Sequence, residues 1–343
     1  MDKKILSAAI IAVMAAPVVA LADVTVYGQV DLSINAQDID GASDDINMAS
    51  NNSRVGLKGS EDLGNGLNAI FQLEYTVDPS GSDTAAGDIG TGRDQWIGLD
   101  GGFGKVRFGT MSTLYKSTGS SIDPLWDSAL DTRATGMQSG LHSGDGSNGE
   151  GRATNTVGYD TPDFNGFTAG ATYSFDENCT AASAPGCSPD DDAYSLGGKY
   201  ANGPILAFVD YVTSDQGGDD DAWKIGGSYS FGDAAVYGQF ESDGGLIANG
   251  VPGSGAGVSN DSADVWMLGG SYTMGSAMLV AQYGQGDDDS AAGADTGYDS
   301  WTVAGVYSFS KRTLTYAGFN QISDDCAGCG ETDTFGVGLR HKF

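Results

Sequence analysis

The sequence predicts an all-β fold, a 16-stranded antiparallel transmembrane β-barrel. Three observations predict it: sixteen runs of alternating side chains, connections that alternate between short and long, and no apolar run after residue 22 that approaches the roughly 20 residues of a membrane helix. The chain also holds 54 Gly and only 8 Pro among its 343 residues. That composition is typical of many strands joined by turns.

The first 22 residues predict a cleavable secretory signal. Lys3 and Lys4 precede an apolar run, residues 5–22, that ends in the small-residue pattern Ala20-Leu21-Ala22. A single membrane anchor is the alternative, but a proline within the run and the small residues at its end favour cleavage. We therefore expect two units, a signal peptide at 1–22 and a barrel at 23–343.

The predicted strands are joined by two kinds of connection. The short ones are turns such as "EDLGN", "DGG" and "NG", whereas the long ones hold the acidic runs and the cysteines. Strict alternation of the two kinds, with an even strand count, is typical of outer-membrane barrels with short periplasmic turns and long external loops. The runs lie at approximately 23–34, 51–60, 66–77, 92–100, 103–110, 151–160, 166–176, 192–201, 204–214, 221–231, 234–243, 262–273, 276–286, 298–309, 311–322 and 331–343.

The last run carries the clearest pattern of faces. Phe335, Val337, Leu339, His341 and Phe343 share one parity, and small or polar residues occupy the other. Ten residues with a period of two suit a tilted strand that crosses a bilayer. A soluble β-sandwich also has many short strands, but the small and medium apolar side chains of other runs suit a barrel that meets lipid outside and water inside.

Charge excludes one large class of partners. After residue 22 the chain has 14 Lys and Arg, which is 16 less Lys3 and Lys4, and 45 Asp and Glu, which is 46 less Asp2, so its formal charge is -31. Nucleic acid is not an expected partner, because binding phosphates requires a basic surface. The acidic runs at 190–192, 219–221 and 287–289 lie in predicted loops. A solvated acidic exterior is favoured over metal binding, and we expect no metal and no cofactor.

Four cysteines form two close pairs, Cys179 with Cys187 and Cys326 with Cys329. In an exported chain, such pairs predict two short disulfides. A zinc site of four thiolates is the alternative. It is disfavoured because the pairs lie in separate loops and the first spacing is wide.

The chain resembles the general, non-specific trimeric porins of Gram-negative outer membranes. The stretches that carry the resemblance are "VTVYGQVDLSI", "SRVGLKGSEDLGNGLNAIFQLE", "RDQWIGLDGGFGKVRFGT", "NTVGYDTPDFNGFTAGATY" and the terminal Phe343. The resemblance implies a homotrimer in the outer membrane, in contact with its lipid and lipopolysaccharide. It also implies that Phe343 is an assembly signal for the barrel-assembly machinery, and that small hydrophilic solutes and ions pass by diffusion.

The longest connection, about 111–149, is the expected constriction, because a wide lumen takes its specificity from whatever narrows it. By resemblance this loop folds inward. Asp123, Asp127 and Asp131 recur every four residues and would share one face of a helical turn. Trp126 either narrows the pore or anchors the loop to the wall, and anchoring is favoured. Positions that match the family's basic wall cluster are Arg54, Lys58, Arg93 and Arg152.

Acid on the loop and base on the wall predict a transverse field that orders solutes without binding them tightly. The loop carries Pro124-Leu125-Trp126-Asp127 where the enterobacterial type has a Pro-Glu-Phe-Gly-Gly run, so it departs from the family pattern at this point. Acidic external loops favour weak cation selectivity. The alternatives are a substrate-specific channel, a surface adhesin barrel or, least favoured, a hydrolase built on His142, so we expect no enzyme.

Overall fold

The computed structural model describes residues 23–40, 45–81, 92–143, 151–175, 192–214, 220–243, 260–290, 297–324 and 330–343. The expected signal peptide and all four cysteines lie outside these ranges, so those predictions remain predictions. Within them, no helix is both long enough and apolar enough to cross a membrane.

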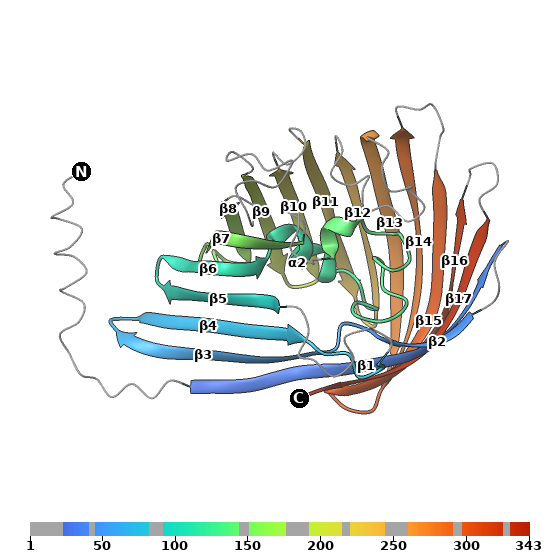
Figure 1. The fold of residues 1–343 in the computed structure, drawn as a ribbon, viewed down its shortest axis with the longest axis horizontal. Coiled ribbons are helices and arrows are strands. Elements are labelled where there is room, and N and C mark those ends of the chain that lie inside the picture. The colour runs from blue at the N-terminus through green and yellow to red at the C-terminus, as the bar shows by residue number, and fades with distance from the viewer. Residues whose placement is uncertain are drawn as a thin grey trace.

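Seventeen strand segments form one closed antiparallel sheet (Figure 1). Residues 23–29 of β1 pair with β3 and residues 32–37 pair with β2, so β2 and β3 are one strand interrupted at 51–53. The predicted 16-stranded barrel is therefore confirmed. The segments are β1 (Asp23–Ile39), β2 (Asp45–Ser50), β3 (Arg54–Gly64), β4 (Leu67–Thr76), β5 (Gly92–Gly101), β6 (Gly104–Ser112), β7 (Arg152–Asp160), β8 (Phe167–Ser174), β9 (Ala193–Asn202), β10 (Ile205–Ser214), β11 (Asp220–Phe231), β12 (Ala234–Asp243), β13 (Asn260–Met274), β14 (Ala277–Ser290), β15 (Tyr298–Ser308), β16 (Thr313–Asp324) and β17 (Glu331–Lys342).

The barrel closes where the last strand meets the first. β17 pairs with β1 from Gln29 opposite Lys342 to Ile39 opposite Thr332. The final residue extends this contact, because the Phe343 amide donates to the Gly28 carbonyl at 3.1 Å and the Gly28 amide donates back at 3.2 Å. Closure leaves no unpaired sheet edge, which a strand in hydrocarbon requires.

The two faces of the sheet reverse the arrangement of a soluble protein. Large apolar side chains point outward and are exposed, as with Val26 at 61 % and Phe335 at 50 %. Polar side chains of the opposite parity point inward and are buried, as with Asp31 and Glu241, both 0 % exposed. An apolar exterior and a polar interior suit a barrel whose outside meets lipid.

The described part of the connection between β6 and β7 lies inside the ring of strands (Figure 1). It contains α2 (Leu114–Ser120), a series of turns and the short helix η1 (Gly140–His142). We call its described part, residues 113–143, the inner segment. Thr113 caps α2 by accepting a hydrogen bond from the Lys116 amide at 3.3 Å.

The main apolar contacts of the barrel interior join the inner segment to one wall. Tyr115 and Leu141 pack on β10, β11, β13 and β15, and Leu125 and Leu130 on β14, β15 and β16. Glycines in the wall make room: a Cβ at Gly318 would lie 2.7 Å from Leu130 Cδ1. Burial of these side chains holds the segment against β10 to β16, on one side of the lumen.

We predict that Gly28→Ala weakens barrel closure. A Cβ at Gly28 would lie 2.4 Å from the Arg54 carbonyl oxygen and 2.6 Å from the Phe343 ring, and overpacking of this kind costs about 1–3 kcal/mol. On electrophoresis after graded heating, the folded band should disappear at a lower temperature. Gly198→Ala is the matched control, because a Cβ there meets nothing within 4 Å. Equal heat resistance of the two variants would contradict the prediction.

Candidate functional site

The smaller of two adjoining interior cavities lies between the inner segment and the wall formed by β3, β4, β5 and β7. Its volume is about 200 Å³. We call it the constriction. It is lined by Arg54, Glu74, Arg93, Asp94, Ser112, Lys116, Ser117, Ser120, Trp126, Asp127, Arg133 and Arg152.

Ion pairs cross and border the constriction. Arg54 Nη1 on β3 lies 2.9 Å from Asp127 Oδ2 on the inner segment. On the wall itself, Arg93 Nε lies 2.6 Å from Glu74 Oε1. Each guanidinium therefore has a carboxylate partner, which lowers the cost of removing both from bulk water.

Arg152 completes the wall cluster from β7. Its Nε lies 2.9 Å from Asp94 Oδ1, and the same oxygen accepts a hydrogen bond from Ser112 at 3.0 Å. The structure thus brings Arg54, Arg93 and Arg152 into one cavity from three separate strands. It also sets charges of both signs around the passage, which creates a field across it.

Lys58 lies apart from this cluster. Lys58 is on β3, after Arg54 in the chain and closer to the short turn that ends the strand. Its ammonium lies 5.1 Å from the centroid of the Tyr27 ring. Lys58 lines a different cavity with Trp96 and Lys105. The wall cluster therefore contains three of the four expected basic residues.

The stretch 123–131 forms successive turns rather than the expected helical turn. The Trp126 amide donates to Asp123, and the Ser128 amide donates to Leu125, both between residues three apart. Asp127 has a φ of 63°, in the left-handed region, so the three aspartates do not share one helical face. The loop therefore departs from the prediction at the point where its sequence departs from the enterobacterial pattern.

Asp123 supports the segment from within instead of facing the passage. Its carboxylate accepts hydrogen bonds from the Leu125 amide at 2.8 Å, from the Thr132 amide at 2.9 Å and from Gln282 on β14 at 3.1 Å. Burial, together with nearby Asp131, raises the pKa of Asp123 to about 6. This carboxylate holds the shape of the loop and ties it to the wall.

Asp127 and Asp131 converge on Arg133, which the sequence analysis did not select. Arg133 Nη2 contacts Asp131 and lies 3.5 Å from Asp127 Oδ1. The Arg133 guanidinium also lies 3.7 Å from the centroid of the Trp126 ring. Trp126 therefore lines the constriction with its ring against a guanidinium group, and the favoured expectation that it anchors the loop to the wall stays a prediction.

Other lining residues were also missed. Glu74 and Asp94 occupy inward-facing positions of β4 and β5, so polar residues on the lumen parity were a usable signal. Lys116 gave no such signal, because it lies on α2. Burial, with Arg152 and Arg93 nearby, lowers the pKa of Lys116 to about 6.

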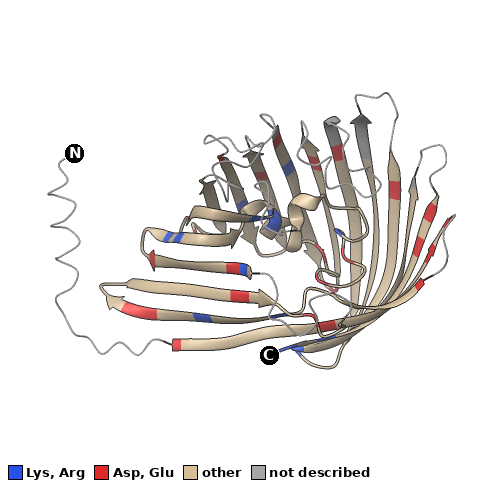
Figure 2. Cartoon of the chain, viewed as in Figure 1, with Lys and Arg blue, Asp and Glu red and all other residues tan. Residues whose placement is uncertain are grey.

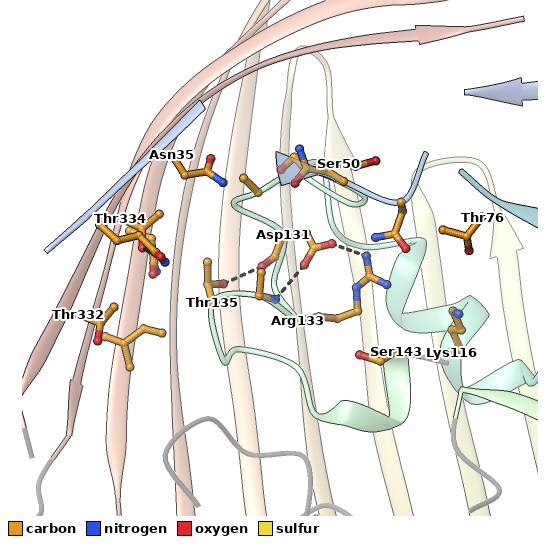
Figure 3. Close-up of a pocket in the computed structure, with 18 of the residues that line it drawn as sticks. Asn35, Ser50, Thr76, Lys116, Asp131, Arg133, Thr135, Ser143, Thr332 and Thr334 are labelled. Carbon is orange, nitrogen blue, oxygen red and sulfur yellow. Dashed lines mark hydrogen bonds and ion pairs between the residues drawn. The ribbon is translucent and has the colours of Figure 1, made fainter. Parts of the chain in front are cut away.

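A second cavity of about 680 Å³ continues the passage toward the long connections. It shares Arg93, Lys116 and Arg133 with the constriction, so the two spaces adjoin. Figure 3 shows Asn35, Thr332, Thr334 and Thr135 around it. Much of the lining is amide and hydroxyl, which hydrogen-bond water and solutes without a strong preference for one molecule.

A buried row of charges lies beneath the inner segment on the opposite wall. Asp210 on β10, Lys224 on β11 and Glu241 on β12 are direct cross-strand neighbours. All three are at most 1 % exposed. Buried charges of this kind require paired partners, and the inner segment supplies several of them.

The segment docks on this row through α2 and η1. Lys224 Nζ donates to the Tyr115 carbonyl and lies 2.8 Å from His142 Nε2. Glu241 accepts hydrogen bonds from the Tyr115 hydroxyl at 2.9 Å and from the Ser139 hydroxyl at 2.6 Å. Burial and Lys224 hold the pKa of His142 well below its usual range, so the ring is neutral and its Nε2 can accept a hydrogen bond from the Lys224 ammonium.

A hydrolase built on His142 would need a neighbouring serine, and Ser139 lies beside it. Ser139 Oγ donates to Glu241 and lies 3.5 Å from His142 Nδ1. Ser139, His142 and Glu241 are each at most 1 % exposed. The group is structural: it fixes the segment, and its side chains are covered.

Comparisons of the sequence identify the family, and comparisons of the structure identify the fold. A family model described as Gram-negative porin matches residues 8–327. The major outer membrane protein P.IB of Neisseria lactamica is 31 % identical over 348 residues, which cover 96 % of this chain and 97 % of that protein. An anion-selective porin from Comamonas acidovorans has a similar fold, with a TM-score of 0.75 and 27 % identity over 94 % of this chain and 100 % of that one. OmpT of Vibrio cholerae, solved in a trimer form, matches with a TM-score of 0.67 and 17 % identity over 94 % of this chain and 99 % of that one.

We predict that Lys224→Met loosens the inner segment. The change leaves Asp210 and Glu241 buried without their cation, and breaking a buried pair costs about 3–5 kcal/mol. Single-channel recordings should show a noisier open state with a larger mean conductance. Lys199→Met, on β9, which is separated from β11 by β10, is the control and should leave the noise unchanged. A quiet channel of parental conductance in Lys224→Met would show that apolar packing alone holds the segment.

Proposed function

This chain belongs to the Gram-negative porin family, and on that premise we propose that it is a general, weakly cation-selective diffusion channel. As a member of the family it is an outer-membrane channel protein and not an enzyme. Small hydrophilic solutes and ions pass it by passive diffusion. The observation that carries the proposal of a general channel is the passage itself, which runs from the outer cavity of about 680 Å³ into the constriction.

The charges that line the constriction support low solute specificity. Its guanidinium groups are paired with carboxylates at 2.6 to 2.9 Å, as with Arg93 and Glu74 or Arg54 and Asp127. A paired charge orients a passing dipole but offers little net attraction to one solute. Such a passage favours sorting by size and charge over recognition of a particular molecule.

Ion selectivity depends on two opposing features. Four guanidinium groups and three carboxylates line the constriction, together with Lys116, whose lowered pKa of about 6 leaves it largely neutral at pH 7. The remaining excess of positive charge favours anions. The similar Comamonas acidovorans protein is anion-selective by name. Against this, the long connections are strongly acidic, and a mouth of one sign concentrates counter-ions before they reach the constriction. We propose that at low ionic strength the acidic mouth outweighs the constriction and produces a weak cation preference.

The assembled form belongs to the same proposal. We propose a homotrimer in contact with outer-membrane lipid and lipopolysaccharide, with Phe343 as the signal read by the barrel-assembly machinery. The position of Phe343 supports the last point, because its outward-facing ring lies at the seam between β17 and β1 and is 47 % exposed. Cross-linking of the native membrane protein that yields only monomer would remove the trimer from the proposal.

We predict size-dependent uptake of sugars by liposomes that contain the protein. The swelling rate should fall smoothly as the sugar becomes larger, and one sugar should not saturate it. Arg152→Ala should admit larger sugars, because it removes a long side chain from the constriction. Arg312→Ala, in a short turn, is the matched control and should resemble the parent. Saturable uptake of a single sugar would support a substrate-specific channel instead.

We predict opposite shifts of ion selectivity for two constriction variants. Asp127→Asn removes the partner of Arg54 and should reduce the cation preference, whereas Arg152→Ala exposes the Asp94 carboxylate and should increase it. The reversal potential under a KCl gradient measures both. Asp233→Asn, in a short turn, is the control for loss of one charge. Anion selectivity of the parent at 0.1 M salt, where the screening length is about 10 Å, would show that the constriction outweighs the mouth.

A further inference from the structure

The charge of this barrel is separated along the axis of the pore. Long connections mark one end of the barrel, which we call the outer end, and short turns mark the other, the inner end. By sequence, 30 of the 45 Asp and Glu residues after residue 22 lie in the outer strand ends and the connections that join them. Those stretches are 38–45, 78–88, 145–150, 176–192, 215–221, 243–264, 287–299 and 324–333.

None of these outer stretches contains a Lys or an Arg. All 14 basic residues after residue 22 therefore lie at the level of the inner segment or closer to the inner end, together with the remaining 15 acidic residues. These outer stretches of the sequence have a formal charge of -30, and the rest of the chain after residue 22 has a formal charge of -1. By residue order, almost the whole net charge belongs to the stretches that join or end the strands on the side of the long connections.

The described residues place this boundary in the structure. Asp45, Asp221, Asp264 and Asp333 lie at the outer ends of β2, β11, β13 and β17, and acidic residues recur near the strand ends that lead into the long connections (Figure 2). At the inner end charges of both signs occur together. Arg107, for example, lies 2.8 Å from Asp160.

A channel with one charged mouth and one nearly neutral mouth does not conduct equally in both directions at low salt. The acidic mouth is rich in cations and poor in anions. When the outer side is positive, cations move from this reservoir into the neutral part, and anions that arrive from the inner side accumulate with them. When the outer side is negative, anions leave through the inner mouth and the acidic mouth resupplies few, so the neutral part is depleted of ions.

We propose that this protein rectifies ion current, with the higher conductance when the outer side is positive. The inference rests on the proposed function as an open diffusion channel and adds a direction to it. The property needs no moving gate, because it follows from fixed charges. It is therefore distinct from the cation preference, which describes the ratio of the two ions and not the direction of the current.

The test is the current through single channels at +100 and -100 mV in symmetric KCl. We expect a current ratio of roughly 1.5 in 0.1 M salt, where the screening length is about 10 Å, and close to unity in 1 M salt, where it is about 3 Å. Acidifying one chamber to about pH 4, near the ordinary pKa of carboxyl groups, identifies which chamber faces the outer end. Only acid in that chamber protonates the acidic mouth and makes the currents in the two directions equal. The larger current must flow when that same chamber is positive at neutral pH.

Two sets of variants separate this property from general effects of charge. Asp→Lys at Asp45, Asp221, Asp264 and Asp333 should reduce the current ratio, since it removes charge from the acidic mouth. The same change at Asp62, Asp100, Asp163 and Asp233 of the inner end should increase the ratio, because it makes the opposite mouth basic. An open channel with equal currents in both directions at 0.1 M salt would overturn the inference and leave the diffusion function intact. A protein that forms no conducting channel would instead overturn the proposed function.

Discussion

The apolar contact between the inner segment and β10 to β16 is the interaction on which the pore depends. A 16-stranded barrel encloses more space than its own inward side chains fill, so an inserted segment decides how much remains open. Leu125, Leu130, Tyr115 and Leu141 bury themselves against one wall and leave the opposite wall free. The passage therefore lies beside β3, β5 and β7, where Arg54, Arg93 and Arg152 project.

Charged groups reinforce this arrangement in two different ways. Under the segment, Asp210, Lys224 and Glu241 are covered, and their cost of desolvation is offset only while Tyr115, Ser139 and His142 remain docked. Around the passage the paired side chains are largely covered but line the cavity, so they also set the local field there. The same kinds of side chain thus fix the segment on one wall and act on solutes at the other.

Most of the barrel could be predicted from the sequence because strand patterns are local. Alternation in Phe335 to Phe343 requires only that one face meet lipid and the other water, and the predicted runs match the strands apart from their ends. The predicted run 51–60 begins at the interruption, so β2, which precedes it and pairs with β1, was not predicted as a strand. The site was predicted less completely: Arg54, Arg93, Arg152 and Asp127 meet in the constriction, whereas Lys58 lies apart and Glu74, Asp94, Lys116 and Arg133 were not selected.

The sequence by itself determined the strand number, the two faces and the placement of charge along the axis, since each follows from residue order and from the alternation of long and short connections. Only the tertiary structure decided which wall the inner segment covers and which groups pair across the opening. The left-handed backbone of Asp127 and the contact of Arg133 with the Trp126 ring depend on packing against residues more than a hundred positions away, such as Val280 and Tyr316. A local pattern of aspartates carries no information about those partners, because burial and long-range hydrogen bonds override the intrinsic preference of a short loop.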